Sequence, residues 1–164
     1  MTLDQLNACD RANFVDAVGW VFEHSPWVAE RAWDERPFAS IAQLHASMTR
    51  NVVNADRAQQ LALLRAHPDL GSRARMSDAS TGEQAGAGLT TLTREEFDRL
   101  QELNTAYRER FGFPFLYAVK GSTTRDIMAA LERRISASPS DEFEEALRQV
   151  YRIAEFRLRD LIHR

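Results

Sequence analysis

The chain has 164 residues, 44% of them hydrophobic and 27% charged, and a formal net charge of −3 at pH 7. This length favours one domain, and the interspersed acids and bases exclude the basic surface of a nucleic-acid-binding protein. No secretory signal and no apolar run of membrane-spanning length is visible, and the single cysteine, Cys9, excludes an internal disulfide. These features predict a cytoplasmic globular protein without a nucleic-acid or membrane partner.

The first part of the chain shows helical periodicity, with a residue typical of helix starts before each run. We expect helices to begin after Asp10, Pro26, Ser40 and Asp56. The side chains expected on buried faces are Phe14, Val18, Val21, Phe22, Ile41, Leu44, Met48, Val52, Leu61 and Leu64. We expect the last of these helices to stop near Ala66 or His67, because a residue before a proline is pushed out of the α region.

The segment between residues 68 and 93 is the loosest part of the chain, with four of the seven glycines. Within it we expect only a short helix, from about Gly82 to Ala87. Beyond it, the capping-box pattern of Thr93 and Glu96 predicts a helix that ends at Gly112.

Residues 113–119 form an apolar run that is predicted to be extended and buried, and we call this segment the strap. Two more helices follow: one opened by Thr123 or Thr124, and a last, longest helix capped by Ser140 and running to about Ile162. No stretch shows the convincing alternation of a strand. The sequence therefore predicts an all-α fold, a single-domain bundle of about eight helices over residues 1–164 with one extended apolar strap.

His67 is a candidate for chemistry because it lies at a predicted helix C-terminus. Unpaired carbonyls there favour a protonated imidazole, and Asp69 adds a nearby negative charge. A histidine poised in this way is suited to act as a general acid or base near neutral pH. The alternative is a structural histidine that bonds the last carbonyls of the helix.

Ser80 and Glu83 also have two interpretations. The pattern Ser-x-x-Glu can form a capping box, in which the glutamate folds back onto the amide of the serine. Alternatively, the short helix begins at a pocket and directs its free amides, together with Ser80, Glu83 and Gln84, at an anionic ligand.

Arg157 lies on or beside the apolar stripe of the last predicted helix. A buried arginine keeps its charge and needs an anionic partner. That partner is either an internal acid or the carboxylate or amide of a substrate.

The strap and the adjacent Phe111 are rich in aromatic residues, which fits core packing and a pocket wall for a flat polar ligand at once. No paired-Cys or His-x-x-x-His metal spacing and no glycine-rich nucleotide loop occurs in the sequence, so we expect neither a structural zinc site nor a nucleotide cofactor. Lys120 is the only lysine, which fits either a composition bias or a need for a primary amine.

Six segments, taken together, resemble the 2-oxo-4-hydroxy-4-carboxy-5-ureidoimidazoline (OHCU) decarboxylase family of urate breakdown. They occur in the order of the family and near its spacing, and they extend over nearly the whole chain. The segments are His67-Pro68-Asp69-Leu70-Gly71, Ser80-x-x-Glu83-Gln84-x-x-Ala87-Gly88-Leu89, Leu103-Asn104-x-x-Tyr107, Phe111-Gly112-Phe113-Pro114-Phe115, Ala118-Val119-Lys120-Gly121 and Arg157-Leu158.

The resemblance implies an all-α carboxy-lyase of purine metabolism that converts the small molecule OHCU to (S)-allantoin without a cofactor. It implies that His67 and Glu83 are catalytic. The residues that it implies to bind substrate are Pro68, Ser80, Gln84, Phe115, Leu116, Tyr117, Ala118, Val119 and Arg157. It also implies a homodimer, and the lack of a peroxisomal Ser-Lys-Leu-type C-terminus favours a cytoplasmic enzyme.

Two other interpretations fit the sequence. One is a non-enzymatic helical binding module in which Glu83 and Arg157 are structural and the strap is core. The other is a family member that acts on a different ring ureide.

Overall fold

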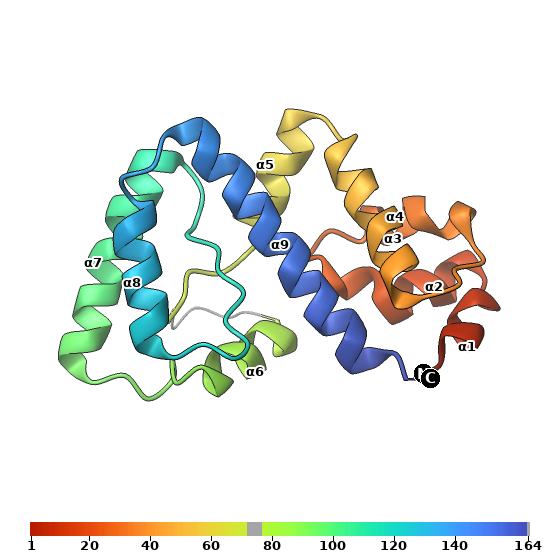
Figure 1. Ribbon diagram of the computed structural model, residues 1–164, viewed down its shortest axis with the longest axis horizontal. Coiled ribbons are helices and arrows are strands. Elements are labelled where there is room, and N and C mark those ends of the chain that lie inside the picture. The colour runs from red at the N-terminus through yellow and green to blue at the C-terminus, as the bar shows by residue number, and fades with distance from the viewer. Residues whose placement is uncertain (72–76, 164) are drawn as a thin grey trace. The chain divides into compact units, whose positions relative to one another are not determined.

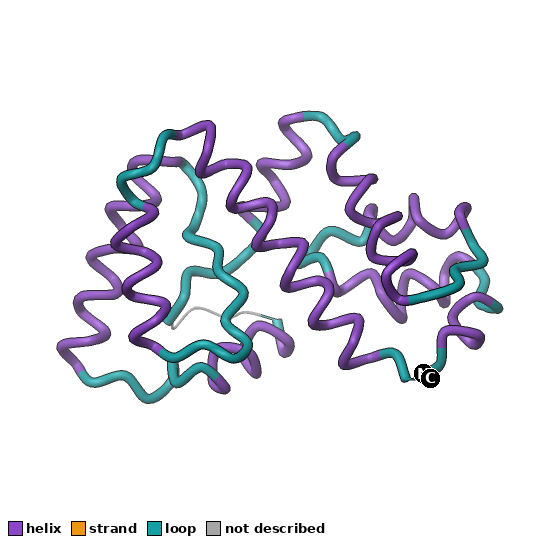
Figure 2. Tube along the Cα trace, viewed as in Figure 1, coloured by secondary structure: helices purple, strands orange, loops and turns teal. Residues whose placement is uncertain are grey.

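The computed structural model of the chain describes residues 1–71 and 77–163. Within these ranges every regular element is a helix, and the only β-type contact is an isolated bridge between Thr2 and His163 (Figure 2). The α-helices are α1 (Leu3–Asn7), α2 (Arg11–Val18), α3 (Trp27–Ala32), α4 (Ile41–Val53), α5 (Arg57–Arg65), α6 (Asp78–Gly86), α7 (Arg94–Phe111), α8 (Thr124–Arg134) and α9 (Pro139–Leu161), and the 3-10 helices are η1 (Gly19–Val21) and η2 (Trp33–Glu35). The predicted all-α fold is confirmed.

The chain divides into two compact units, and the long helix α9 contributes to both. Unit 1 comprises Met1–Ala66 and Tyr151–Arg164, and unit 2 comprises His67–Val150. None of the helices in the described ranges has the length and apolarity needed to cross a membrane.

Unit 1 begins its helices where the sequence predicts. The side chains of Asp10, Ser40 and Asp56 each accept a hydrogen bond from the backbone N–H three residues later, which caps α2, α4 and α5. The two chain ends lie side by side in Figure 1, where the N–H of His163 donates to the carbonyl of Met1 at 2.7 Å.

The buried faces of unit 1 also follow the predicted pattern, with three differences, of which one is Ile41, at the start of α4, which is only partly buried. Val21 and Phe22 are buried as expected but lie beyond the end of α2, in η1 and just after it. On α5, Leu64 is buried, whereas Leu61 is only partly buried and Leu63 takes the inner position.

Unit 2 is built on α7 and α8, which lie side by side (Figure 1). The predicted capping box of Thr93 and Glu96 opens α7, and Gly112 ends it with a φ of 81°, a conformation that suits glycine. Thr123 opens α8, as one of the two predicted alternatives.

The start of α9 differs from the prediction. The helix begins at Pro139, and the Oγ of Ser138 accepts a hydrogen bond from the N–H of Asp141 at 3.2 Å, so the cap is Ser138 rather than Ser140. A proline is favoured in the first turn of a helix because its missing N–H would have no partner there.

Candidate active site

The histidine segment, residues 67–71, begins directly after α5. Ala66 is the C-terminal cap of α5, and His67, the first residue of unit 2, is buried with 6% of its surface exposed. Pro68 prevents the helix from continuing. The prediction that this helix stops near Ala66 or His67 is confirmed, because α5 ends at Arg65 with Ala66 as its cap.

Helix α6 starts earlier than the sequence predicts. The Oγ of Ser77 caps it by accepting a hydrogen bond from the N–H of Ser80 at 3.1 Å, so the helix spans Asp78–Gly86 rather than starting near Gly82. The capping-box interpretation of Ser80 and Glu83 is therefore wrong, because Ser80 lies in the first turn and Glu83 in the interior of the helix. The glutamate is not needed to begin α6.

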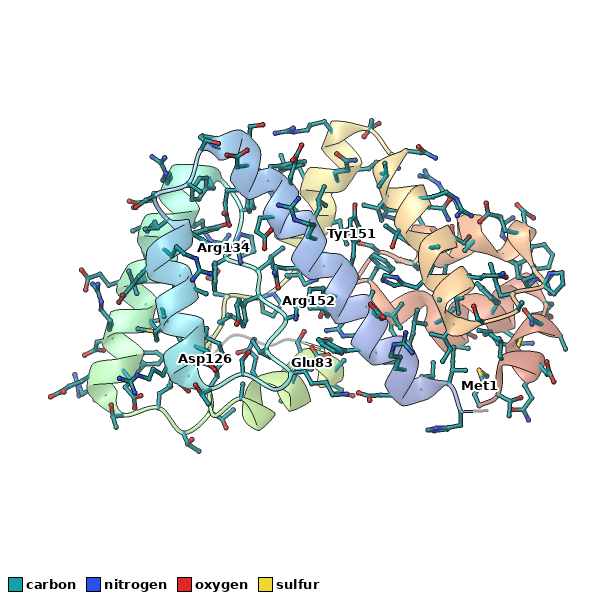
Figure 3. All side chains as sticks on the ribbon, in the orientation of Figure 1. Met1, Glu83, Asp126, Arg134, Tyr151 and Arg152 are labelled. Carbon is teal, nitrogen blue, oxygen red and sulfur yellow. The ribbon has the colours of Figure 1, made fainter. Side chains whose placement is uncertain are left out.

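One face of α6 is turned into unit 2. Ser80 and Gln84 are buried, four residues apart, and Glu83 lies beside them and is half-buried. The Oε1 of Gln84 accepts a hydrogen bond from the N–H of Gly71 at 2.8 Å. This bond ties the histidine segment to the face of α6 that carries Glu83; Figure 3 labels Glu83 on this helix.

Helix α7 holds the histidine segment from a second direction. The Nδ2 of Asn104 donates to the carbonyl of Leu70 at 2.9 Å, in a buried position. Nearer the surface, the guanidinium of Arg108 forms a 2.8 Å ion pair with Asp69. The segment after His67 therefore has partners on α6 and on α7.

The strap is buried and lies against aromatic side chains, as predicted. Phe113 and Phe115 both contact the ring of Tyr107 edge-on, with centroids 5.9 and 5.4 Å from it. Of the five residues Phe115–Val119, only Tyr117 is partly exposed. The guanidinium of Arg134 lies over the Phe115 ring at 4.6 Å.

The strap backbone is bound by two polar side chains of unit 2. The Nη1 of Arg134, on α8, donates to the carbonyl of Leu116 at 2.6 Å, and the Oε1 of Gln149, on α9, accepts from the N–H of Ala118 at 2.9 Å. Glu145 accepts a 3.0 Å hydrogen bond from the other end of the Gln149 amide, which orients that amide toward the strap. The position of the strap is thus set by named hydrogen bonds as well as by packing.

A buried acid lies behind the strap. Glu142, with 1% exposure, accepts hydrogen bonds from the Tyr107 hydroxyl and from the Nε of Arg134, the latter at 2.8 Å. Burial, reinforced by the bond to Glu142, raises the pKa of Tyr107. Arg134, labelled in Figure 3, connects this buried charge to the strap.

Arg157 belongs to unit 1 and is buried, with 3% exposure, as its phase on the last helix predicts. Its Nη2 lies 2.9 Å from the Oε2 of Glu23, and its Nη1 donates to the carbonyls of Trp20 and Val21 at 3.4 and 3.3 Å. Of the two interpretations from the sequence, the structure shows the internal ion pair. The substrate role of Arg157 stays a prediction.

The family profile described as OHCU decarboxylase matches residues 7–159 of the chain. The chain belongs to the OHCU decarboxylase family.

Relatives of this OHCU decarboxylase family member cover it almost end to end. The 2-oxo-4-hydroxy-4-carboxy-5-ureidoimidazoline decarboxylase of Haloferax volcanii is 54% identical over 158 residues, which are 96% of this chain and 94% of that protein. A uric acid degradation bifunctional protein of Bacillus subtilis is 48% identical over 161 residues, 98% of this chain and 33% of that protein. A crystal structure of (S)-allantoin synthase superposes with a TM-score of 0.82 at 35% identity, over 99% of this chain and 54% of that one, so the chain spans about half of its length.

Several residues that shape the site were not predicted as site residues from the sequence. Asn104 and Tyr107 lay in a segment of the family resemblance without an assigned role, and their spacing of three placed them on one helix face. Arg134, Glu142 and Gln149 had no motif to mark them. The only feature of the sequence that could have indicated these three residues is that they are polar and stand at positions of amphipathic helices that are buried.

Other sequence observations acquire no role in the site. Lys120 is exposed at the end of the strap. Among residues 1–71 and 77–163, no group of three or more His, Cys, Asp or Glu side chains could hold a metal ion.

Proposed function

We propose that the chain catalyses the decarboxylation of OHCU to (S)-allantoin in urate degradation, as a carboxy-lyase. The observation that carries the proposal is the hydrogen bond from Gly71 to Gln84 in a chain of this family. It brings the segment of His67 and the Glu83 face of α6 into one part of unit 2.

The reaction defines what the site must do. The substrate carries a carboxylate on a ring carbon that also bears a hydroxyl group. When the bond between the ring carbon and the carboxylate carbon breaks, carbon dioxide leaves, and the electron pair of that bond forms a double bond to the adjacent unsaturated ring carbon, whose ring nitrogen takes up a proton. The hydroxyl group then gives up its proton and becomes a carbonyl of allantoin, while one proton is added to one face of the adjacent ring carbon. The site must therefore fix the ring, stabilise the developing negative charge and supply that proton.

His67 and Glu83 are the groups that we assign to proton transfer. In this proposal His67 lies near the hydroxyl and carboxylate of the substrate and acts as the acid–base group. Glu83 orients the ureido or hydroxyl group and holds His67 in its working protonation state. The position of Glu83 in the interior of α6 supports this role, because its carboxylate does not serve as a cap.

Substrate binding is assigned to Pro68, Ser80 and Gln84, to residues 115–119 of the strap, and to Arg157. The strap binds through its backbone. Arg134 binds the carbonyl of Leu116 and Gln149 binds the N–H of Ala118, and these two bonds hold the backbone on either side of Tyr117. We assign the N–H and C=O of Tyr117 to the polar edge of the ring.

The remaining elements of the proposal come from the family resemblance. The substrate is a small molecule, the reaction needs no cofactor, and the enzyme acts in the cytoplasm as a homodimer.

The test generates the unstable substrate in situ, in the assay mixture. Urate is converted to OHCU by urate oxidase and hydroxyisourate hydrolase, and the optical activity of the allantoin formed is followed with and without the protein. We expect (S)-allantoin to form faster with it. An equal rate in both arms contradicts the proposal, and a faster rate with another ring ureide identifies a different substrate.

Two variants test the assigned catalytic groups. His67→Ala and Glu83→Gln should each lower turnover by orders of magnitude while the helical content stays unchanged. His163→Ala and Asp78→Asn, both exposed, are the matched controls and should retain wild-type rates. Because Ser77 rather than Glu83 takes part in capping α6, a slow Glu83→Gln variant cannot be explained by loss of the cap. If Glu83→Gln turns over as fast as the control Asp78→Asn, Glu83 has no part in the mechanism.

A further inference from the structure

Two polar residues on α7 have no role in the proposed chemistry. Asn104 and Tyr107 are three residues apart, so they share one face of the helix, and both are buried, with 3% and 0% exposure. A leucine and a phenylalanine would fill these positions without needing polar partners. What the polar groups bind therefore indicates why they are present.

Asn104 binds the segment that carries the proposed acid–base group. Its Nδ2 donates at 2.9 Å to the carbonyl of Leu70, three residues after His67. The Oδ1 of the same side chain is buried and has no hydrogen-bond partner among the described residues. A buried acceptor without a partner is unfavourable, so the Oδ1 of Asn104 lowers the stability of the fold. Only the hydrogen bond that its Nδ2 donates is favourable.

Tyr107 is connected to the strap by hydrogen bonds through two buried side chains, Glu142 and Arg134. Its hydroxyl donates to Glu142, the Nε of Arg134 donates to the same carboxylate oxygen at 2.8 Å, and the Nη1 of Arg134 donates to the carbonyl of Leu116 at 2.6 Å. Each hydrogen bond restricts the next group: the Tyr107 hydroxyl orients the Glu142 carboxylate, and that carboxylate orients the Arg134 guanidinium. The end of this path is the backbone that we assign to substrate binding.

We propose that Asn104 and Tyr107 are positioning residues of the decarboxylation. One turn of α7 sets the histidine segment through Asn104, and sets the strap through Tyr107, Glu142 and Arg134. The same turn therefore fixes the acid–base group and the ring-binding backbone relative to each other within unit 2. This inference rests on the proposed function, since it concerns residues that this function assigns to the substrate.

The two residues should have different kinetic signatures. Tyr107→Phe removes only the hydroxyl and keeps the ring contacts with Phe113 and Phe115. The strap binds substrate and transition state alike, so KM should rise about three- to tenfold with little change in kcat. Asn104→Leu should lower kcat by about 10- to 100-fold with KM nearly unchanged, because His67 acts in the transition state and a small displacement is sufficient.

The experiment measures kcat and KM with substrate generated in place, together with the melting temperature of each variant. Thr105→Ala, an exposed change on the same helix, is the control and should match the wild type in both constants. Asn104→Ser is the second variant at this position, in case the leucine impairs folding. A thermal shift with (S)-allantoin gives a second measure of binding, and we expect it to shrink for Tyr107→Phe alone.

The outcomes separate this inference from the function on which it rests. A wild type that does not accelerate (S)-allantoin formation overturns the proposed function before any variant is compared. An active wild type whose Tyr107→Phe and Asn104→Leu variants melt earlier but keep wild-type kcat and KM overturns the positioning role. Equal losses in kcat for both variants, with KM and the allantoin shift unchanged, also overturn it, because a strap displaced from the substrate must weaken binding.

Discussion

The buried ion pair of Arg134 and Glu142 makes a strong prediction about stability. The two side chains are 8% and 2% exposed, and the Nε of the arginine lies 2.8 Å from the Oε1 of the glutamate. Arg134→Met keeps an unbranched side chain of similar length but removes the positive charge. Glu142 is then left as a buried carboxylate, with the Tyr107 hydroxyl still donating to it.

The size of the effect follows from the burial of the pair. Removing one partner of a buried ion pair costs about 3–5 kcal/mol, out of a total stability of about 5–15 kcal/mol. For a chain of this length, each 1 kcal/mol lowers the melting temperature by about 2–4 °C, so Arg134→Met should melt about 6–20 °C lower than the wild type. The double variant Arg134→Met, Glu142→Leu removes both charges. It should lose only about 1–3 kcal/mol, because the Tyr107 hydroxyl is then the buried group without its acceptor.

Thermal melts followed by far-ultraviolet circular dichroism measure both variants. Arg133→Met is the matched control: it lies in the same last turn of α8 but is exposed, so it should lose at most about 1 kcal/mol. If Arg134→Met melts within about 2 °C of this control, the pair does not stabilise unit 2 as argued. The single variant Glu142→Leu completes the comparison, and if the double variant loses the sum of the losses of Arg134→Met and Glu142→Leu, the two charges are not coupled.

Three further predictions concern other buried or capping groups. Burial and a hydrogen bond to a carboxylate raise the pKa of Tyr107 above its ordinary value of 10.0, so the unfolded chain loses this proton first as the pH rises. Wild type should therefore lose stability more steeply than Tyr107→Phe as the pH rises above about 10, by up to about 1.4 kcal/mol per pH unit, and parallel urea midpoints would contradict this. Ser77→Ala should cost about 1 kcal/mol through loss of the α6 cap, and an unchanged melting temperature contradicts the observed cap; Ser80→Ala should keep the cap and raise KM. Glu23→Gln should cost about 3–5 kcal/mol in chemical denaturation because it removes the charge of the buried carboxylate that lies 2.9 Å from the Nη2 of the buried Arg157, and an unchanged midpoint would show that this ion pair is not needed.

The helix starts were predictable because capping is local. Asp10, Ser40, Asp56 and Thr93 each bond an amide three residues away, and both partners stand in the same short stretch of sequence. The prediction failed at α9, where serines flank a proline on both sides. Both serines fit the pattern, and only the preference of proline for the first helical turn selects Ser138.

The partners of the candidate site were less predictable because they are distant in sequence. The phase of Arg157 showed that it is buried, but its acid, Glu23, is 134 residues away. Likewise, Gln149 binds the strap across 31 residues, and Arg134 binds it across 18. An amphipathic pattern indicates which residues are buried, whereas a hydrogen-bond partner is chosen by the tertiary fold.

The capping patterns give a last argument about Glu83. The pairs Thr2 and Gln5, Thr93 and Glu96, and Thr123 and Asp126 have the same spacing as Ser80 and Glu83, and each of the three forms a reciprocal capping box. Ser80 and Glu83 do not, because Ser77 begins α6 one turn earlier. Local patterns that fail in an otherwise consistent sequence are expected at functional positions, where a side chain is selected for something other than folding. The glutamate whose capping box does not form is the one that the proposed mechanism needs for the substrate.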